Sequence, residues 1–295
     1  MTHRIGVDIG GTFTDFALFD ERASQIAIHK QLTSPDDPSR AVLEGVTVML
    51  RDNGVAIADV ESLAHGTTLV TNALIERKGT VTGMLVTRNF LDVPDMAREQ
   101  RYDLFDLRLT FPEPLVPRNQ RREISERVGY DGAVAKALDL SEAEDAVRDL
   151  VDNAGIKALA ICMLHSYANP THEQAIEGMV REKFPDLHVS TSADVYAGMG
   201  EWERWTTTSM NAYTQPLFDS YLSRIENGLA DLGFAGKLYI MTSSGGMLLP
   251  ETARRYPARM LESGPAAGVL MSAFHGRALN LDNILSFDLG GTTAK

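Results

Sequence analysis

The sequence has very little cysteine and fewer basic than acidic residues. Cys162 is the single cysteine among 295 residues, so no disulfide forms within the chain and a reducing compartment is indicated. The net charge is −12, from 28 basic and 40 acidic residues, which argues against nucleic acid and anionic membranes as partners. No apolar run reaches the roughly 18 residues that a membrane-spanning helix requires, and no secretory leader precedes Arg4. These absences predict a cytoplasmic protein.

The composition is that of an ordinary globular protein. Apolar residues make up 44% of the sequence and charged residues 23%, and the length fits one large or two ordinary domains. Cys162 lies in the apolar run 158–164, which predicts a buried strand. Core packing is therefore its expected role.

The stretch 5–15 carries the strongest functional signal. Apolar residues 5–9 predict a buried strand that contains one acid, Asp8, and then breaks into Gly10, Gly11 and Thr12. A carboxylate late in a buried strand needs a cation or hydrogen-bond donors, and glycines let a ligand approach main-chain N–H groups. The apolar run 16–19 predicts a returning strand, so the turn is a hairpin. An ordinary hairpin turn is one interpretation, and a site for a phosphate tail with its Mg²⁺ is the other.

The end of the chain repeats this stretch almost residue for residue. Asp288 is followed by Leu289, Gly290, Gly291, Thr292 and Thr293, much as Asp8 is followed by Ile9, Gly10, Gly11, Thr12 and Phe13. Two such hairpins indicate two related half-structures that face one phosphate site. Here the sequence resembles the actin, sugar kinase and heat-shock chaperone superfamily, whose two ribonuclease-H-like domains each present such a loop to ATP.

Further motifs resemble, more narrowly, the hydantoinase A, 5-oxoprolinase and acetone carboxylase family. They are the segments 8–15 (Asp-Ile-Gly-Gly-Thr-Phe-Thr-Asp), 65–68 (His-Gly-Thr-Thr), 71–79, 262–269 (Glu-Ser-Gly-Pro-Ala-Ala-Gly-Val) and 288–295. The resemblance implies an α/β chain with the ribonuclease-H-like fold of actin-like ATPases, its first lobe complete and its second lobe truncated. Residues 1–200 are then the N-terminal domain, with an inserted segment near 88–122. Residues 201–295 are a helical connection and the incomplete start of the second lobe.

Local patterns between these motifs predict alternating helices and strands. Three strands within 5–30 are followed by a helix from Pro38 that Asn53 and Gly54 end, which is how a ribonuclease-H-like fold opens. Ser141 and Glu144 have the spacing of a capping box and predict a helix start at Ser141. The remaining predicted elements are strands at 81–87, 122–128, 157–164, 187–191 and 237–241 and helices at 69–78, 171–184 and 209–232. Pro216 is expected to bend or split the last of these helices, and Ser263 is expected to cap a helix that follows it.

The resemblance assigns the candidate site residues. Its catalytic candidates are Asp8, Asp15, His65 and Asp288, of which Asp8 and Asp288 would hold Mg²⁺. Its nucleotide-binding candidates are Gly10, Gly11, Thr12, Thr14, Gly245, Gly246, Gly290, Gly291, Thr292, Thr293 and Lys295. Its substrate-side candidates are Thr67, Thr68, Asn72, Ser263 and Gly264. His65 is equally well interpreted as a hydrogen-bond donor to a ligand or as a structural histidine. For Ser263 the alternative to a substrate-side role is that its segment is only a structural connection.

The activity that the resemblance implies is ATP-dependent hydrolysis of a small cyclic amide such as a hydantoin or 5-oxoproline. ATP and Mg²⁺ would phosphorylate the carbonyl oxygen, and a hydantoinase B-like subunit or C-terminal region would open the ring within an oligomer. An ATP-dependent ketone carboxylase subunit and a non-catalytic actin-like nucleotide-binding scaffold are the alternatives. The chain is either a fragment or one part of a split protein, and it is expected to bind Mg-ATP poorly by itself.

Overall fold

A computed structural model describes residues 3–34, 36–100, 103 and 105–289 of the chain. The chain forms two compact units. Unit 1 comprises Met1–Lys78 and Leu217–Lys295, and unit 2 comprises Gly79–Pro216. Within the described residues, no helix is both long enough and apolar enough to cross a membrane.

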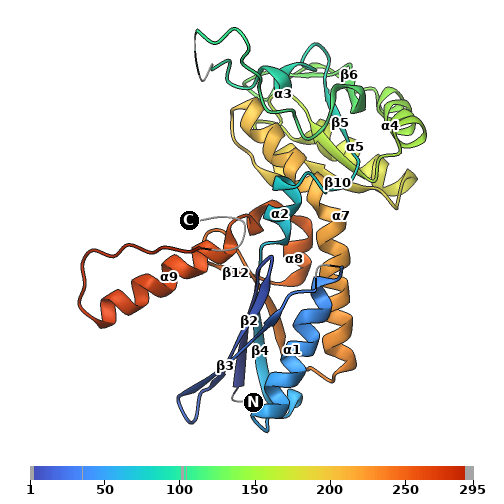
Figure 1. Cartoon of the computed structure of the whole chain (residues 1–295). Helices are drawn as coiled ribbons and strands as arrows, with labels where there is room; N and C mark the ends of the chain where they lie inside the picture. Colours follow the sequence, from blue (N-terminus) through green and yellow to red (C-terminus); the bar gives the residue numbers. More distant parts are fainter. Residues whose placement is uncertain (1–2, 35, 101–102, 104, 290–295) are drawn as a thin grey trace. The chain divides into compact units, whose positions relative to one another are not determined.

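Unit 1 is built on a six-stranded sheet (Figure 1). Its strands are β1 (His3–Ile9), β2 (Phe13–Asp20), β3 (Gln25–Leu32), β4 (Val60–Thr67), β11 (Lys237–Met241) and β12 (Met247–Leu248). They lie in the order β12-β11-β4-β1-β2-β3, with β2 antiparallel to β1 and β3 and with β4 and β11 parallel to β1. A three-stranded meander joined to parallel strands confirms the expected α/β, ribonuclease-H-like fold.

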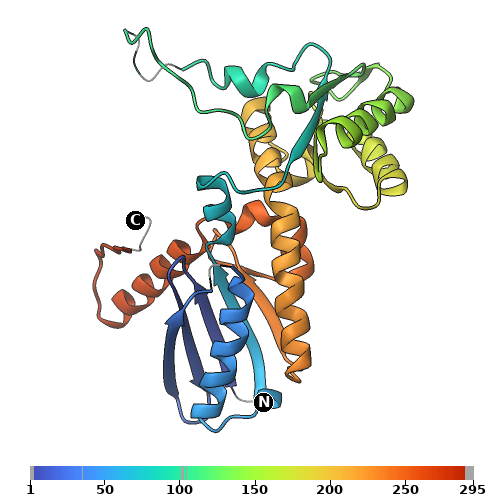
Figure 2. The same cartoon turned by 45° about the vertical axis from the view of Figure 1, so that its right-hand side comes forward.

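Two helices cover one face of this sheet, as Figures 1 and 2 show. They are α1 (Pro38–Asp52) and the part of α7 (Glu201–Asp231) that begins at Leu217. Asp37 caps α1 by accepting the backbone N–H of Ser39, and Asn53 ends it as predicted. Because side chains alternate along β1, Ile5, Val7 and Ile9 are buried against these helices.

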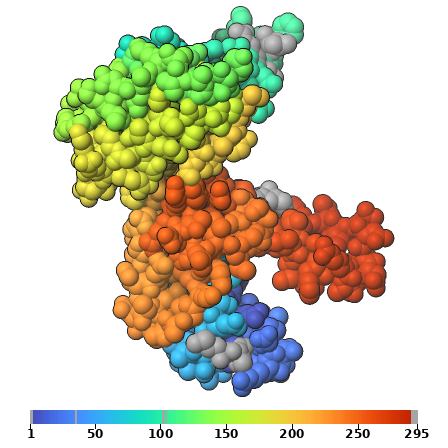
Figure 3. All heavy atoms as spheres, turned by 180° about the vertical axis from the view of Figure 1, so that it is seen from behind, coloured from blue at the N-terminus to red at the C-terminus, as the bar shows by residue number. Residues whose placement is uncertain are grey.

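The opposite face of the sheet carries Asp8 and many small side chains, and it is more open. The remaining helices of unit 1 are α2 (Leu69–Ile75), α8 (Pro250–Arg255) and α9 (Ser263–Ala278), with 3-10 turns at Ile57–Asp59 and Pro257–Met260. The first half of α9 lies near β4 and β11, and Figure 3 shows α9 with the segment after it, in red, standing out from the rest of unit 1. The apolar side chains Leu270, Met271 and Phe274 of α9 are therefore exposed.

Unit 2 contains a four-stranded parallel sheet in the order β10-β9-β5-β6. The strands are β5 (Thr82–Thr87), β6 (Arg121–Ile124), β9 (Ala158–Cys162) and β10 (His188–Thr191). The helices are α3 (Val93–Met96), α4 (Leu140–Ala154), α5 (Thr171–Lys183), α6 (Ser192–Val195) and α7 up to Pro216, with a 3-10 turn at Arg118–Gln120 and a hairpin of β7 (Arg127–Val128) and β8 (Val134–Lys136). Two apolar clusters fill this unit, one with α4 and α5 and the other with Trp205 of α7. Cys162 is fully buried in the second cluster, and burial raises the pKa of its thiol, which confirms its packing role.

The structure corrects four local predictions. Asp139, not Ser141, caps α4, because its carboxylate accepts the backbone N–H groups of Ser141 and Glu142. The helix predicted from residue 209 begins at Glu201 and continues through Pro216 as one helix. Glu262 is the cap residue of α9, and Ser263 is its first helical residue. The strand predicted at 122–128 is two strands, β6 and β7.

The two compact units are divided differently from the sequence-based domains. Residues 79–216 form unit 2 between two parts of unit 1, whereas the predicted boundary lies near residue 200. Most described arginines of the predicted insertion near 88–122 have carboxylate partners within unit 2. They pair as Arg88 with Glu142, Arg98 with Glu203, Arg118 with Asp92, Arg121 with Asp95 and Arg122 with Asp149.

Candidate functional site

A cavity of about 820 Å³ opens on the less covered face of the unit 1 sheet. Its charged lining consists of Asp8, Asp15, Lys30 and Asp288. Gly66 at the end of β4 and Gly264 in the first turn of α9 also line it. The structure therefore brings the acids of the first hairpin together with two other sequence-predicted residues, Asp288 and Gly264.

Asp8 and Asp15 face the cavity from adjacent strands. They are directly paired in the antiparallel register of β1 and β2. Lys30 on β3 is paired with Asp15 in that sheet and holds its carboxylate with Nζ–O distances of 2.7 and 2.9 Å. The Lys30 ammonium also lies 4.9 Å from the centroid of the Phe13 ring. Asp15 thus has a cation of its own, whereas no described cation forms an ion pair with Asp8.

The surroundings of Asp8 disfavour its charged form. Partial burial raises the pKa of the Asp8 carboxyl first, and the carboxylates of Asp15 and Asp288 raise it further. Lys30 opposes these effects only in part. An added cation would relieve this repulsion.

Glycine at two positions leaves space around the Asp8 carboxylate. A Cβ atom at Gly66 would lie 2.9 Å from Oδ1 of Asp8, which is shorter than the contacts that Cβ atoms make in proteins. A Cβ atom at Gly264 would lie 3.7 Å from Oδ1 and 3.9 Å from Oδ2. The carboxylate is therefore approached by backbone from two sides, and a larger residue at position 66 would displace it.

The first hairpin turn is closed by its own backbone. Gly10 donates its N–H to the carbonyl of Phe13 at 2.9 Å, and its carbonyl accepts the hydroxyl of Thr33. Gly11 and Thr12 are exposed at the tip. Thr14 points to the other face of the sheet, where its buried hydroxyl pairs with Thr33. Among the predicted nucleotide-binding residues of this turn, Thr14 consequently does not present its side chain to the cavity.

His65 is placed as a structural histidine. Its fully buried ring lies on the helix-covered face, and Nε2 is 2.5 Å from the hydroxyl of Tyr221 on α7. Burial lowers the pKa of His65 to about 4, and the backbone of Val7 opposes this shift only in part. Burial also raises the pKa of Tyr221, so the phenol stays protonated and donates to a neutral imidazole.

The predicted substrate-side residues meet where β4 joins α2. Thr68 donates its hydroxyl to the carbonyl of Ile9, and the side chain of Asn72 donates to the hydroxyl of Thr68. Thr67 accepts the N–H of Leu69, and its carbonyl accepts the buried hydroxyl of Ser263. These contacts fix the start of α9 beside the end of β1, next to Asp8.

The other predicted glycine turn has a structural explanation. Gly245 and Gly246 form the turn between β11 and β12, where Gly245 adopts a φ of +83° and donates its N–H to Thr242. A Cβ atom at Gly245 would lie 2.6 Å from a side-chain atom of Leu270 on α9. Neither glycine lines the cavity beside Asp8.

The second hairpin lies largely outside the described residues. Asp288 is described and lines the cavity, but Gly290, Gly291, Thr292, Thr293 and Lys295 are not among the residues that the structure describes. Sequence reasoning missed Lys30 and His29, which also line the cavity. A signal existed for Lys30, because an antiparallel meander places every second residue of β3 on the face of Asp15.

The donor set of the cavity fits a hydrated Mg²⁺ rather than a closed metal cage. Among the described residues, no group of three His, Cys, Asp or Glu side chains is arranged to hold a metal ion. Mg²⁺ usually keeps several waters and binds one or two carboxylates together with substrate phosphates. Asp8 and Asp288, with the repulsion at Asp8 only partly compensated by Lys30, match that second pattern.

Comparisons with known proteins cover nearly the whole chain. A family model described as "Hydantoinase/oxoprolinase N-terminal region" matches residues 4–184, and one described as "Hydantoinase/oxoprolinase" matches residues 204–295. An uncharacterised protein of Methanocaldococcus jannaschii is 34% identical over 100% of this chain and 43% of its own length. The caprolactamase alpha subunit of Pseudomonas jessenii is 32% identical, over 99% of this chain and 42% of its own length.

Solved structures agree with these relatives. The crystal structure of the ATP-dependent caprolactamase from Pseudomonas jessenii superposes with a TM-score of 0.88, and a nucleotide-free structure of acetone carboxylase with a TM-score of 0.87 and 28% identity. Each covers 99% of this chain and 43% of the solved chain. The chain thus spans less than half the length of the relatives that it matches.

Proposed function

The chain belongs to the hydantoinase/oxoprolinase family, and we propose that it forms the nucleotide-binding part of an enzyme that phosphorylates the carbonyl oxygen of a small cyclic amide. One relative is an ATP-dependent caprolactamase, which supports both the nucleotide and the amide. The phosphorylated amide would be a better electrophile than the amide itself, so water could open the ring. A partner subunit or a further region of the polypeptide would direct that water.

The observation that carries this proposal is the position of Asp8. Asp8 is the penultimate residue of β1, and its carboxylate faces a cavity and lies between two glycines that leave room around it. Phosphoryl transfer requires mainly positioning and neutralisation of charge. Asp8 and Asp288 would hold Mg²⁺, whose role is to neutralise phosphate charge. The exposed backbone of Gly11 and Thr12 would meet phosphate oxygens, and Lys30 would add positive charge.

Asp15 and the junction of β4 with α2 have supporting roles in this proposal. Asp15 would hold Lys30 at the cavity. Thr68 and Asn72 would hold the start of α2 against the end of β1, and Thr67 would place the start of α9, and hence Gly264, beside Asp8. His65 would keep β4 and α7 together rather than touch substrate. The other predicted residues of the second hairpin, Gly290 to Lys295, would complete the phosphate site.

A ketone carboxylase subunit is the second candidate, because a solved relative is described as an enzyme of ATP-dependent acetone carboxylation. Both candidates use the same Asp8 cavity and differ in substrate. A cytoplasmic enzyme that works with partner subunits fits either candidate. A nucleotide-gated scaffold would share the cavity but show no ATP turnover that depends on a small substrate.

The test measures ADP release by the intact protein with its partner, with 5-oxoproline, hydantoin, caprolactam, or acetone and bicarbonate as substrates. We expect one cyclic amide to stimulate ADP release. We expect Asp8→Asn to lower kcat/KM for ATP roughly 10²- to 10³-fold, in line with the loss of one electrostatic group from an active site. The control, Asp52→Asn, removes an exposed acid that pairs only with the neighbouring Arg51 in the described structure, and it should stay within about twofold of wild type.

Stimulation by acetone and bicarbonate alone would favour the carboxylase. Absence of any substrate-dependent ADP release, with assembly intact, would favour the scaffold. Full substrate-dependent turnover by Asp8→Asn would contradict the role of Asp8.

A further inference from the structure

A second cavity, in unit 2, has the features of a ligand site and lies at the carboxyl end of a parallel sheet. Its volume is about 580 Å³, within the range of small-molecule sites. It is lined by Phe90, which follows β5, by Leu164 and His165, which follow β9, and by Arg127, which follows β6. In open α/β sheets, ligands bind outside the carboxyl ends of the strands. This cavity is independent of the function proposed for unit 1.

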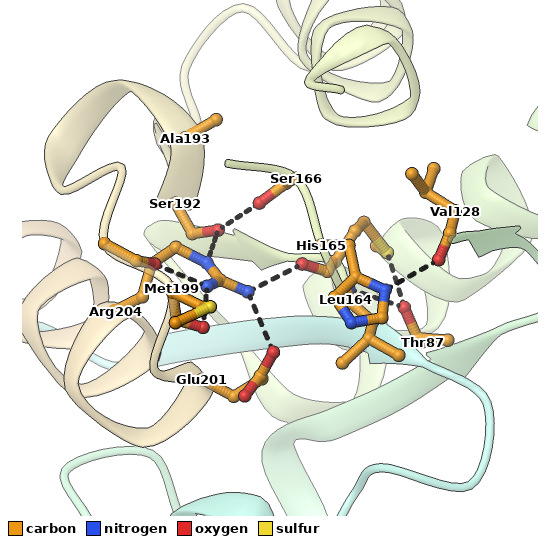
Figure 4. A network of polar contacts seen from close by, with 12 residues as sticks. Thr87, Val128, Leu164, His165, Ser166, Ser192, Ala193, Met199, Glu201 and Arg204 are labelled. Atoms are coloured by element: carbon orange, nitrogen blue, oxygen red, sulfur yellow. Dashed lines mark hydrogen bonds and ion pairs between the residues drawn. The ribbon is translucent and has the colours of Figure 1, made fainter. Parts of the chain in front are cut away.

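A buried polar network fixes the loop that follows β9, as Figure 4 shows. The backbone N–H of Leu164 donates to the hydroxyl of Thr87 at 2.8 Å, and that of Met163 donates to the buried carboxylate of Glu173 at 2.8 Å. The fully buried guanidinium of Arg204 donates to the carbonyl of Met163 and to the hydroxyl of Ser192. His165 directly follows these fixed residues and lines the cavity.

The network holds His165 in an unusual backbone conformation. His165 has a φ of +56°, which is uncommon for a residue with a side chain. Its carbonyl accepts the N–H groups of Ala168 and Asn169, so the conformation is fixed on both sides. Such residues are concentrated at ligand-binding sites, where the surrounding structure compensates for their cost.

The ring of His165 is oriented as well. Its Nδ1 lies 2.9 Å from the carbonyl oxygen of Val128 (Figure 4). A carbonyl only accepts, so Nδ1 carries a proton and Nε2 is the nitrogen left for a ligand. Nε2 accepts a hydrogen bond in the neutral ring and donates one in the imidazolium form. The half-buried ring lines the cavity.

Arg127 provides positive charge without a counter-ion. Its half-buried guanidinium lies 4.9 Å from the centroid of the Phe90 ring, and in the described part of the chain no carboxylate forms an ion pair with it. Three acids also line the cavity: Glu99 is exposed, and the half-buried Glu201 and Glu203 already have cations. Glu203 pairs with Arg98, and Glu201 lies 3.9 Å from Arg204.

We propose that this cavity binds a small organic carboxylate with an apolar body. Arg127 offers the charged donors that suit a carboxylate, and His165 in its imidazolium form would donate a second hydrogen bond from Nε2. Phe90, Leu164 and Trp202 form an apolar wall that an inorganic anion would leave unused. The ligand class is therefore an aliphatic or aromatic monocarboxylate rather than a free phosphate.

Intrinsic tryptophan fluorescence can test this proposal, because the chain has only two tryptophans. Trp202 lines the cavity, and Trp205 is fully buried in the apolar cluster with Met84 and Cys162. The probes are sodium hexanoate, inorganic phosphate and hexanol, titrated into the 295-residue protein. We expect saturable binding of hexanoate, and at least tenfold weaker binding of phosphate and of hexanol. The signal should disappear in Trp202→Phe.

Variants locate the contacts. Arg127→Gln should weaken hexanoate binding at least tenfold, and His165→Asn, which keeps a residue that tolerates a positive φ, should weaken it severalfold. The control is Arg88→Gln, an exposed arginine of the same unit that pairs with Glu142 outside the cavity, and it should stay within twofold. Unchanged affinity in Arg127→Gln, or equal affinity for phosphate, would overturn the proposal. If neither variant folds, hexanoate should still protect peptides of residues 160–170 from hydrogen exchange in the wild-type protein, and no protection would equally overturn it.

Discussion

Replacing His65 by glutamine should remove a specific part of the pH dependence of stability. The ring is fully buried between β4 and α7 and accepts the hydroxyl of Tyr221. The folded protein therefore holds a neutral imidazole, and the pKa of His65 falls from 6.5 to about 4. Between these two values the unfolded chain binds more protons at His65 than the folded protein does. The free energy of unfolding must then fall as the pH decreases through this window.

The magnitude follows from the two pKa values. One pKa unit corresponds to about 1.4 kcal/mol, so the whole window from 6.5 down to about 4 corresponds to about 3 kcal/mol. At pH 5 the loss from this one residue is about 2 kcal/mol relative to pH 7.5. Glutamine does not titrate, so the variant should lack this contribution. At pH 7.5 the variant should itself be about 1 kcal/mol less stable, because the pairing with Tyr221 is weakened.

The assay is native-state hydrogen exchange of peptides from β1 and β4 at pH 7.5 and pH 5, corrected for the intrinsic rates, together with urea unfolding followed by circular dichroism. A loss of about 2 kcal/mol corresponds to roughly 30-fold faster exchange through opening of unit 1 in the wild-type protein. The control is His188→Gln on β10 of unit 2, which should leave the pH dependence of the unit 1 peptides unchanged. If His65→Gln and wild type lose equal stability between the two pH values, His65 is not the neutral buried histidine described here.

Two further substitutions test the packing and the capping of helices. Gly45→Ala in α1 should destabilise the protein by about 1–2 kcal/mol despite the better helix propensity of alanine, because the new Cβ would lie 2.0 Å from the buried ring of Phe16; a Tm equal to wild type would contradict this. Asp139→Ala should cost about 1 kcal/mol in urea unfolding, whereas Ser141→Ala should cost much less, and the reverse order would restore Ser141 as the cap of α4.

Much of the fold was predictable because its signals are local. The three-stranded opening, α1 and its end at Asn53 follow from alternation, helical periodicity and capping, and all are confirmed. The cap of α4 was predicted two residues late, since Asp139 and Ser141 both suit an N-cap and only the backbone conformation decides between them. The early start of α7 at Glu201 was missed because Trp202 and Trp205 gave no clear helical period before burial was known.

The site was predictable only in part, because strand alternation decides which side chains reach the cavity. Asp8 and Asp15 have partners on the same face, whereas Thr14 and His65 lie on the other. The motif alone does not predict which face of the sheet each of these side chains lies on, because that depends on the strand register. The position of Lys30 beside Asp15 depends on the pairing of β2 with β3, which brings together residues from different strands of the meander.

The charge of the cavity bears on how a polyphosphate could bind there. Its charged lining is three carboxylates and one lysine, a formal charge of −2, and Lys30 is already engaged by Asp15. A phosphate chain without a metal would meet repulsion, both locally and from a chain of net charge −12. Burial and, after it, this repulsion raise the pKa of Asp8, so a cation that binds there gains by relieving the repulsion. We therefore expect that metal binding in this cavity, as proposed above, is linked to loss of the Asp8 proton, and that nucleotide binding there depends on a divalent cation.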